Sequence, residues 1–150
     1  MAETEPEYRN SPTYKVLEII CTMLDIQVYY GEPSGSAYAV AEVDNSSPHI
    51  IMSRSRIESA DYAARVLGHE IGHCLIEGFY CKIDEKNFLS PNAQDVGYLI
   101  ELQCDQIGNS LYLLAKRIAE EVAASGEDIR DFINRAISET MERDGKPKTD

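Results

Sequence analysis

The spacing of the apolar residues changes twice along this chain of 150 residues, and these changes constrain its fold more than any other feature. Apolar residues first recur every three to four positions, which predicts a helix over residues 12–24 that begins at Pro12. Alternating and β-branched runs then predict three short strands at residues 26–30, 37–43 and 49–53. Helical spacing returns after residue 54. The order predicts an α+β fold with its sheet in the first half of the chain.

The second half of the chain predicts three more helices. Ser55 and Glu58 have the spacing of a capping box, and the helix that follows them ends near Gly78. After a loop over residues 79–92, a long apolar stripe predicts a helix that is broken at Ser125-Gly126, and an amphipathic helix follows it. We expect one domain over residues 12–143, between flexible tails at 1–11 and 144–150.

Composition excludes several classes of protein. The chain has 14 Lys and Arg against 26 Asp and Glu, a net charge of −12, and no basic stripe that could neutralise nucleic-acid phosphates. No apolar run approaches the length of a membrane span, and the acidic N-terminal decapeptide is unlike a signal peptide. We therefore expect a cytoplasmic protein with no direct contact to nucleic acid or membrane. Its four cysteines are expected to be buried thiols: Cys21, Cys74, Cys81 and Cys104.

Two of the three histidines fall in one window, His69-Glu70-Ile71-Gly72-His73, inside the first helix of the second half. Residues four apart on a helix share a face, so both imidazoles can bind one zinc ion while Glu70 lies beside it. Gly68 and Gly72 each cost about 1 kcal/mol of helix propensity relative to Ala. We expect close approach of another element to explain Gly72.

The next helix offers a third ligand. Glu101 and Asp105 are again four residues apart, so one carboxylate can bind the metal while the other accepts the ring N–H of a liganding histidine. Taken alone, this acidic pair is a weak pattern. The pair predicts a metal site only in combination with the histidine window that precedes it.

The combination of His69-Glu70-x-x-His73 with Glu101-x-x-x-Asp105 resembles the gluzincin arrangement of zinc metallopeptidases. More narrowly, the chain resembles the ImmA/IrrE family of small peptidases over roughly residues 15–124, because the second motif continues into a run of leucines. Two departures are Cys104 where a small Ala is usual, and a helix that continues through residues 115–117 where Pro is common.

The resemblance implies a zincin-like fold, with a small sheet packed on the motif helix, and a zinc endopeptidase that cuts a specific protein partner. A basic transcriptional repressor is one candidate substrate, which an acidic surface would attract. Zinc would be bound by His69, His73 and Glu101, with Glu70 as the general base and Asp105 as the partner of His69.

Oxyanion charge that develops during hydrolysis needs a further donor. Tyr98, one turn before Glu101, is the first candidate, and Tyr80 and His49 are the others. The strand at residues 49–53 is expected to offer an open edge on which an extended substrate can pair.

Two other functions remain open from the residues alone. The chain could be an interaction module that keeps the fold and the metal but has little or no proteolytic activity. It could instead hold a structural or redox metal through Cys74, Cys81 or Cys104 together with the histidines, although Cys74 points about 100° away from His73 around the helix.

Overall fold

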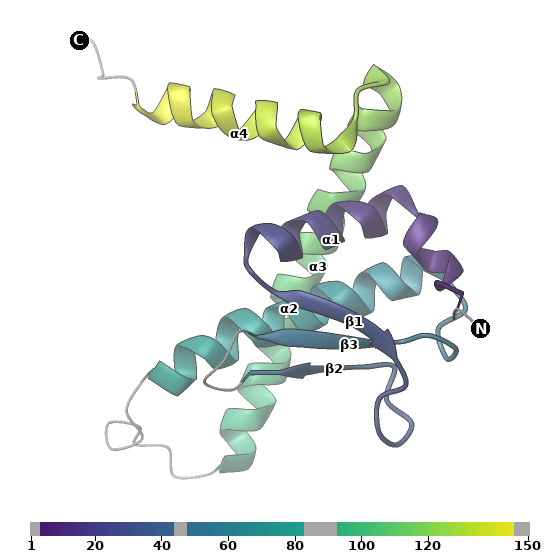
Figure 1. Cartoon of the computed structure of the whole chain (residues 1–150). Coiled ribbons are helices and arrows are strands. Elements are labelled where there is room, and N and C mark those ends of the chain that lie inside the picture. The colour runs from purple at the N-terminus through teal and green to yellow at the C-terminus, as the bar shows by residue number, and fades with distance from the viewer. Residues whose placement is uncertain (1–3, 44–47, 83–92, 146–150) are drawn as a thin grey trace.

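The computed structural model describes residues 4–43, 48–82 and 93–145 as an α+β domain (Figure 1). A short 3-10 helix, η1 (Glu7–Asn10), precedes the remaining elements. These are α1 (Pro12–Met23), β1 (Gln27–Gly31), β2 (Ala39–Glu42), β3 (His49–Ser53), α2 (Ala60–Lys82), α3 (Ala93–Ser125) and α4 (Ile129–Gly145). The predicted order of one helix, three strands and three helices is confirmed.

The three strands form a mixed sheet in the order β1-β3-β2. Strand β3 pairs in parallel with β1 and antiparallel with β2. The prediction that residues 49–53 offer an open edge is therefore wrong, because β3 is the central strand. Sequence spacing cannot reveal this order, since β1 and β2 follow each other in the chain but lie on opposite sides of β3 in the sheet. The edges of the sheet are β1 and β2.

Helices cover one face of the sheet. Every second strand residue points to that face, and Ile50 and Met52 of β3 are fully buried there. Their neighbours across the sheet, such as Val28 and Ala41, pack against the same core. Helix α2 packs against β2, β3 and α1, and most extensively against α3. The core thus lies between the sheet and the three helices α1, α2 and α3.

Part of the predicted flexible tail at residues 1–11 packs against the domain, since η1 lies within it. Within it, Tyr8 of η1 is buried, and its hydroxyl donates a hydrogen bond of 2.7 Å to the carbonyl oxygen of Ser53. Its ring packs edge-on against that of Tyr14. Pro6 is buried as well, and the guanidinium of Arg9 donates two hydrogen bonds to the carboxylate of Glu18 on α1, although the sequence of this segment shows no period.

Helix α2 begins later and ends later than the sequence predicts. The side chain of Ser59 caps it by accepting from the backbone N–H of Tyr62, whereas Ser55 binds the carboxylate of Glu32 through its N–H and hydroxyl. The Ser55–Glu58 capping box is therefore wrong. The helix also passes Gly78 and continues to Lys82.

The other helix ends follow the sequence. Ser11 caps α1 before Pro12, and Gly126 ends α3 with a φ of 71°, a left-handed conformation that favours glycine. Asp128 caps α4 through the backbone N–H of Arg130. Helix α4 projects away from the sheet (Figure 1). Among the described residues, no helix is long and apolar enough to cross a membrane. The predicted tail at 144–150 falls largely outside the described residues.

Candidate metal centre

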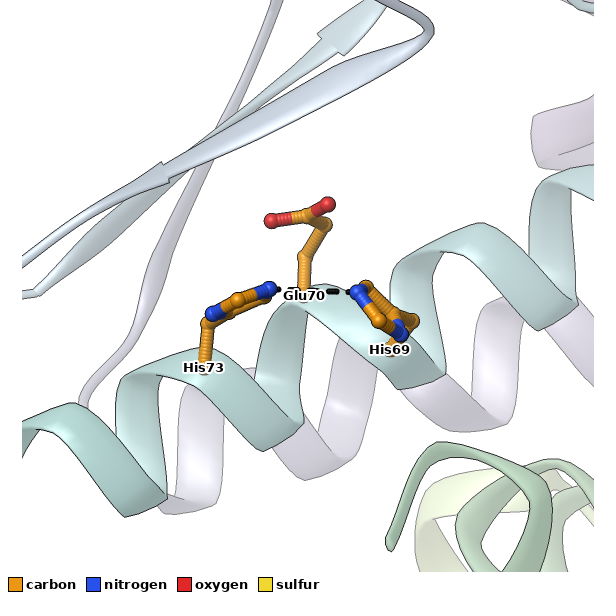
Figure 2. A group of neighbouring side chains, drawn as sticks. All are labelled: His69, Glu70 and His73. Carbon is orange, nitrogen blue, oxygen red and sulfur yellow. Dashed lines mark hydrogen bonds between the residues drawn. The ribbon is translucent and has the colours of Figure 1, made fainter. Parts of the chain in front are cut away.

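The His69–His73 window lies in the middle of α2, with both imidazoles projecting from the same side of the helix (Figure 2). Their Nε2 atoms are 3.1 Å apart. The carboxylate of Glu70 lies beside the two rings, and one donor atom from each of these three residues falls within 4.8 Å of the others. One turn of helix α2 therefore brings two imidazole nitrogens and a neighbouring carboxylate close together.

The carboxylate of Glu101 reaches the same point from α3. Its Oε2 lies 3.2 Å from Nε2 of His69, and its Oε1 lies 3.1 Å from Nε2 of His73. We call His69 Nε2, His73 Nε2 and the Glu101 carboxylate the ligand triangle. Glu101 was selected from the sequence by its spacing to an acid four residues later, and the structure brings it together with both histidines.

Asp105 lies one turn further along α3 and contacts the other side of His69. Its Oδ1 is 2.7 Å from Nδ1 of His69. A carboxylate at this distance favours the tautomer with its proton on Nδ1, in which the lone pair is on Nε2, the atom that faces His73 and Glu101. The structure therefore gives the predicted pair of acids two separate positions, one at Nε2 and one at Nδ1.

The dimensions of the ligand triangle fit a zinc ion. Zinc bonds of about 2.0–2.1 Å in tetrahedral geometry separate any two donor atoms by about 3.3–3.4 Å. The two Nε2 atoms are 3.1 Å apart, and a different oxygen of the Glu101 carboxylate lies 3.2 Å from that of His69 and 3.1 Å from that of His73, all within a few tenths of an ångström of that value. Two imidazoles and one carboxylate are also a donor set that zinc uses at catalytic sites, where a fourth position stays open for water. The donor set and its dimensions are therefore compatible with zinc.

Close packing of α2 on α3 holds the two halves of the triangle together. A Cβ atom at Gly68 would lie 2.7 Å from the carbonyl oxygen of Gly108, and one at Gly72 would lie 3.0 Å from Cα of Cys104. A Cβ atom at Gly108 would lie 2.7 Å from the backbone nitrogen of His69. We call these three glycines the glycine crossing. The close approach predicted for Gly72 is confirmed, and Gly108 is a position that the sequence interpretation missed.

A second contact between the helices lies on the N-terminal side of His69. The hydroxyl of Tyr112 donates a short hydrogen bond to the carboxylate of Asp61, which also accepts from Nε of Arg65 at 3.0 Å. Both interactions lower the pKa of the Asp61 carboxyl, the bond from Tyr112 most strongly. The guanidinium of Arg65 also stacks over the Tyr112 ring. Polar residues on two helices carry no sequence signal of such a contact.

A small cavity of about 180 Å³ opens beside the ligand triangle. It is lined by Arg65, His69, Asp105, Gly108 and Asn109. The cavity shows that the surface next to His69 is hollowed on the side where α2 begins.

Of the three candidates for an oxyanion donor, the two whose side chains are described, Tyr98 and His49, make no observed contact with the ligand triangle. Tyr98 lies on α3 three residues before Glu101, but 70% of its surface is exposed, so packing does not fix its ring. Nε2 of His49 lies 2.8 Å from a carboxylate oxygen of Glu42 on the neighbouring strand. The side chain of Tyr80 lies outside the described residues.

The described cysteines lie in the core. Cys21, Cys74 and Cys104 are buried and form no disulfide among the described residues. The potential metal ligands that the structure brings together are two imidazoles and neighbouring carboxylates, and none of them is one of these three cysteines. The observed contacts therefore give no support to the alternative of a cysteine-bound metal. Cys81 lies outside the described side chains.

Comparisons with known proteins do not assign a family. No family model matches the sequence, and neither the curated proteins nor the solved structures gave a match. The functional argument therefore depends on the chemistry of the site itself.

Proposed function

We propose that this protein is a zinc-dependent metalloendopeptidase of the gluzincin type, with a zincin-like fold and a resemblance to the ImmA/IrrE family. The observation that carries the proposal is the ligand triangle, in which donor atoms of His69, His73 and Glu101 stand 3.1–3.2 Å apart while Asp105 holds the far side of His69. Two carboxylates and two imidazoles from two helices converge in this way without forming part of the core.

Each residue would have a separate task. The two histidines and Glu101 would hold the metal, and Asp105 would keep the Nδ1 proton of His69 in place, so that Nε2 stays a donor toward the metal. When bound, zinc would lower the pKa of a water molecule and polarise the substrate carbonyl. Glu70 would accept the proton of that water and return it to the amine that leaves.

Strand β2 would align the substrate. It is an edge strand and packs against α2, so its free edge lies on the side of the sheet nearest the metal centre. The N–H of Ser53 donates to the carbonyl of Tyr38, and the antiparallel ladder therefore uses the backbone of alternate residues beginning at Tyr38. Ala39 and Ala41 consequently direct their N–H and C=O groups to the free edge, where an extended substrate could pair with them.

The substrate class follows from the resemblance and the charge. A specific partner protein with a basic surface, such as a DNA-binding repressor, would be attracted to a chain with a net charge of −12. The proposal takes such a protein as the substrate.

Metal analysis of the unchanged protein and of two purified variants tests the proposal. The unchanged protein is expected to bind one zinc ion per chain, and Glu101→Ala to lose most of it. Glu70→Gln is expected to keep its zinc and to lose cleavage of a peptide library scored by mass spectrometry. Full zinc occupancy in Glu101→Ala would reject the ligand set, and cleavage by Glu70→Gln would reject the base.

A further inference from the structure

Two tyrosines with exposed rings meet at the point where β2 and α2 both begin. Tyr38 immediately precedes β2, and Tyr62 lies in the first turn of α2. Their ring centroids are 5.3 Å apart with an interplanar angle of 86°, which is an edge-to-face pair. The exposed fractions are 45% for Tyr38 and 44% for Tyr62, so each ring keeps much of its apolar surface available. We call these residues the tyrosine pair.

Helix periodicity places Tyr62 on the same face of α2 as the metal ligands. It precedes His69 by seven residues, which on an α-helix is two turns, about 10 Å along the axis and about 20° in rotation. The tyrosine pair thus lies in line with the two histidines on the α2 surface.

The topology determines the direction of α2 relative to β2, and therefore the order in which a substrate passes the histidines and the tyrosine pair. Ser53 ends β3, pairs with Tyr38 and leads into α2, so β2 and α2 both start at the C-terminal end of β3. Helix α2 packs back over β3 and β2, and it therefore runs in the same direction as β2. A substrate paired antiparallel with β2 passes the histidines first and Tyr38 afterwards.

The distance between Tyr62 and His69 along α2 determines which substrate residue would reach the tyrosine pair. An extended chain advances about 3.3 Å per residue, so a separation of about 10 Å corresponds to about three residues. We propose that the tyrosine pair is a specificity subsite that binds an aromatic or large aliphatic side chain about three residues after the scissile bond. This inference rests on the proposed peptidase function and adds a sequence preference to it.

The chemistry of the pair favours apolar ligands. An edge-to-face pair leaves one ring face and one ring edge free, and a third aromatic or aliphatic group can pack against either. The exposed neighbours of Tyr62 on the same helix, Asp61 and Arg65, are charged and pair with each other. The pair therefore differs from its surroundings in the kind of side chain that it would retain.

Binding of hydroxamate tripeptides to the zinc-loaded protein tests the inference without requiring catalysis. The chelating group precedes three residues, of which the third is Phe, Leu, Ala or Gln, and binding is measured by calorimetry. The unchanged protein is expected to bind the Phe compound about 5- to 10-fold more tightly than the Ala compound. Tyr62→Ser and Tyr38→Ser are expected to bring that ratio close to one while binding of the Ala compound is retained.

Tyr29 provides a matched control. It lies on the other edge strand, β1, and is 52% exposed, comparable to the tyrosine pair. Its ring also makes an edge-to-face contact, with the ring of His49 on β3. Tyr29→Ser is expected to leave the ratio unchanged.

The outcomes separate the two proposals. If zinc-loaded protein binds no hydroxamate, the metallopeptidase proposal fails and the subsite fails with it. If all four compounds bind equally, the metal centre stands and the subsite is rejected. A Phe preference that survives both tyrosine substitutions, or that Tyr29→Ser abolishes, also rejects the tyrosine pair as the subsite.

Discussion

Replacing Gly108 with alanine should loosen the metal centre more than it destabilises the fold. The added Cβ would lie 2.7 Å from the backbone nitrogen of His69 and 2.8 Å from its Cα, whereas ordinary contacts begin near 3.4 Å. Because these neighbours are backbone atoms of a packed helix, α3 must move away by about 0.7 Å to restore ordinary contact. Such a movement would lengthen the Glu101 edges of the ligand triangle beyond the separation that zinc requires.

The effects on stability and on zinc affinity should differ in size. Overpacking costs about 1–3 kcal/mol, and Ala in place of Gly recovers about 1 kcal/mol of helix propensity, so the free energy of unfolding should fall by about 0–2 kcal/mol. Zinc affinity should fall by about 10- to 100-fold, the loss typical when residues that position metal ligands are disturbed.

Competition with a chelating dye measures the zinc affinity, and urea titration of metal-free protein measures the stability. Ser110→Ala is the matched control, because Ser110 is an exposed residue of the same helix two positions away. A Gly108→Ala protein that folds and binds zinc as tightly as the unchanged chain would refute the reasoning.

Three further predictions follow from the contacts around the site. Asp105→Ala should weaken zinc binding about 10- to 100-fold through loss of the contact to Nδ1 of His69, and unchanged affinity in the dye assay would contradict that role. Ala41→Pro should leave the β2–β3 ladder intact, because it removes an N–H on the free edge, yet should raise KM for peptide cleavage; an unchanged KM would exclude pairing at that edge. Tyr112→Phe should lower stability at neutral pH by about 0.5–1 kcal/mol, a small value because solvent screens the exposed Asp61. Since the pKa of Asp61 is lowered in the folded state, this stabilisation is present above its unfolded pKa and should disappear as pH falls through the folded value, so a difference between the two proteins that persists in acid would contradict the assignment.

The sequence predicted those parts of the site that local spacing encodes. His69 and His73 share a face because a helix turns every 3.6 residues, and Glu101 and Asp105 reach two atoms of one imidazole for the same reason. Alternating and β-branched runs likewise predicted the three strands.

Long-range packing set the features that sequence interpretation missed. The order of the strands depends on a crossover, and the position of Tyr8 depends on a hydrogen bond across 45 residues. Gly108 carried a visible signal, since an interior glycine is unfavourable in a helix, but its meaning required its partner, Gly68. Helix-weakening glycines in two helices that both carry candidate metal ligands are therefore a pattern to search for jointly.

A double-mutant cycle can separate the two ways in which Gly108 could act on the metal. If the added methyl group weakens zinc binding by moving Glu101 away from the histidines, Gly108→Ala should have little further effect once Glu101 is replaced by alanine, because one ligand cannot be lost twice. If the methyl group acts instead by displacing the backbone of His69, which it contacts directly, the two changes should weaken binding independently and their free energies should add. Zinc titrations of the four proteins measure the coupling. Asp105 also lies on α3 and would move with it, so the same cycle can be repeated with Asp105→Ala in place of Glu101→Ala. A similar coupling energy in both cycles would indicate that the spacing of α2 and α3, rather than any one ligand, determines the zinc affinity.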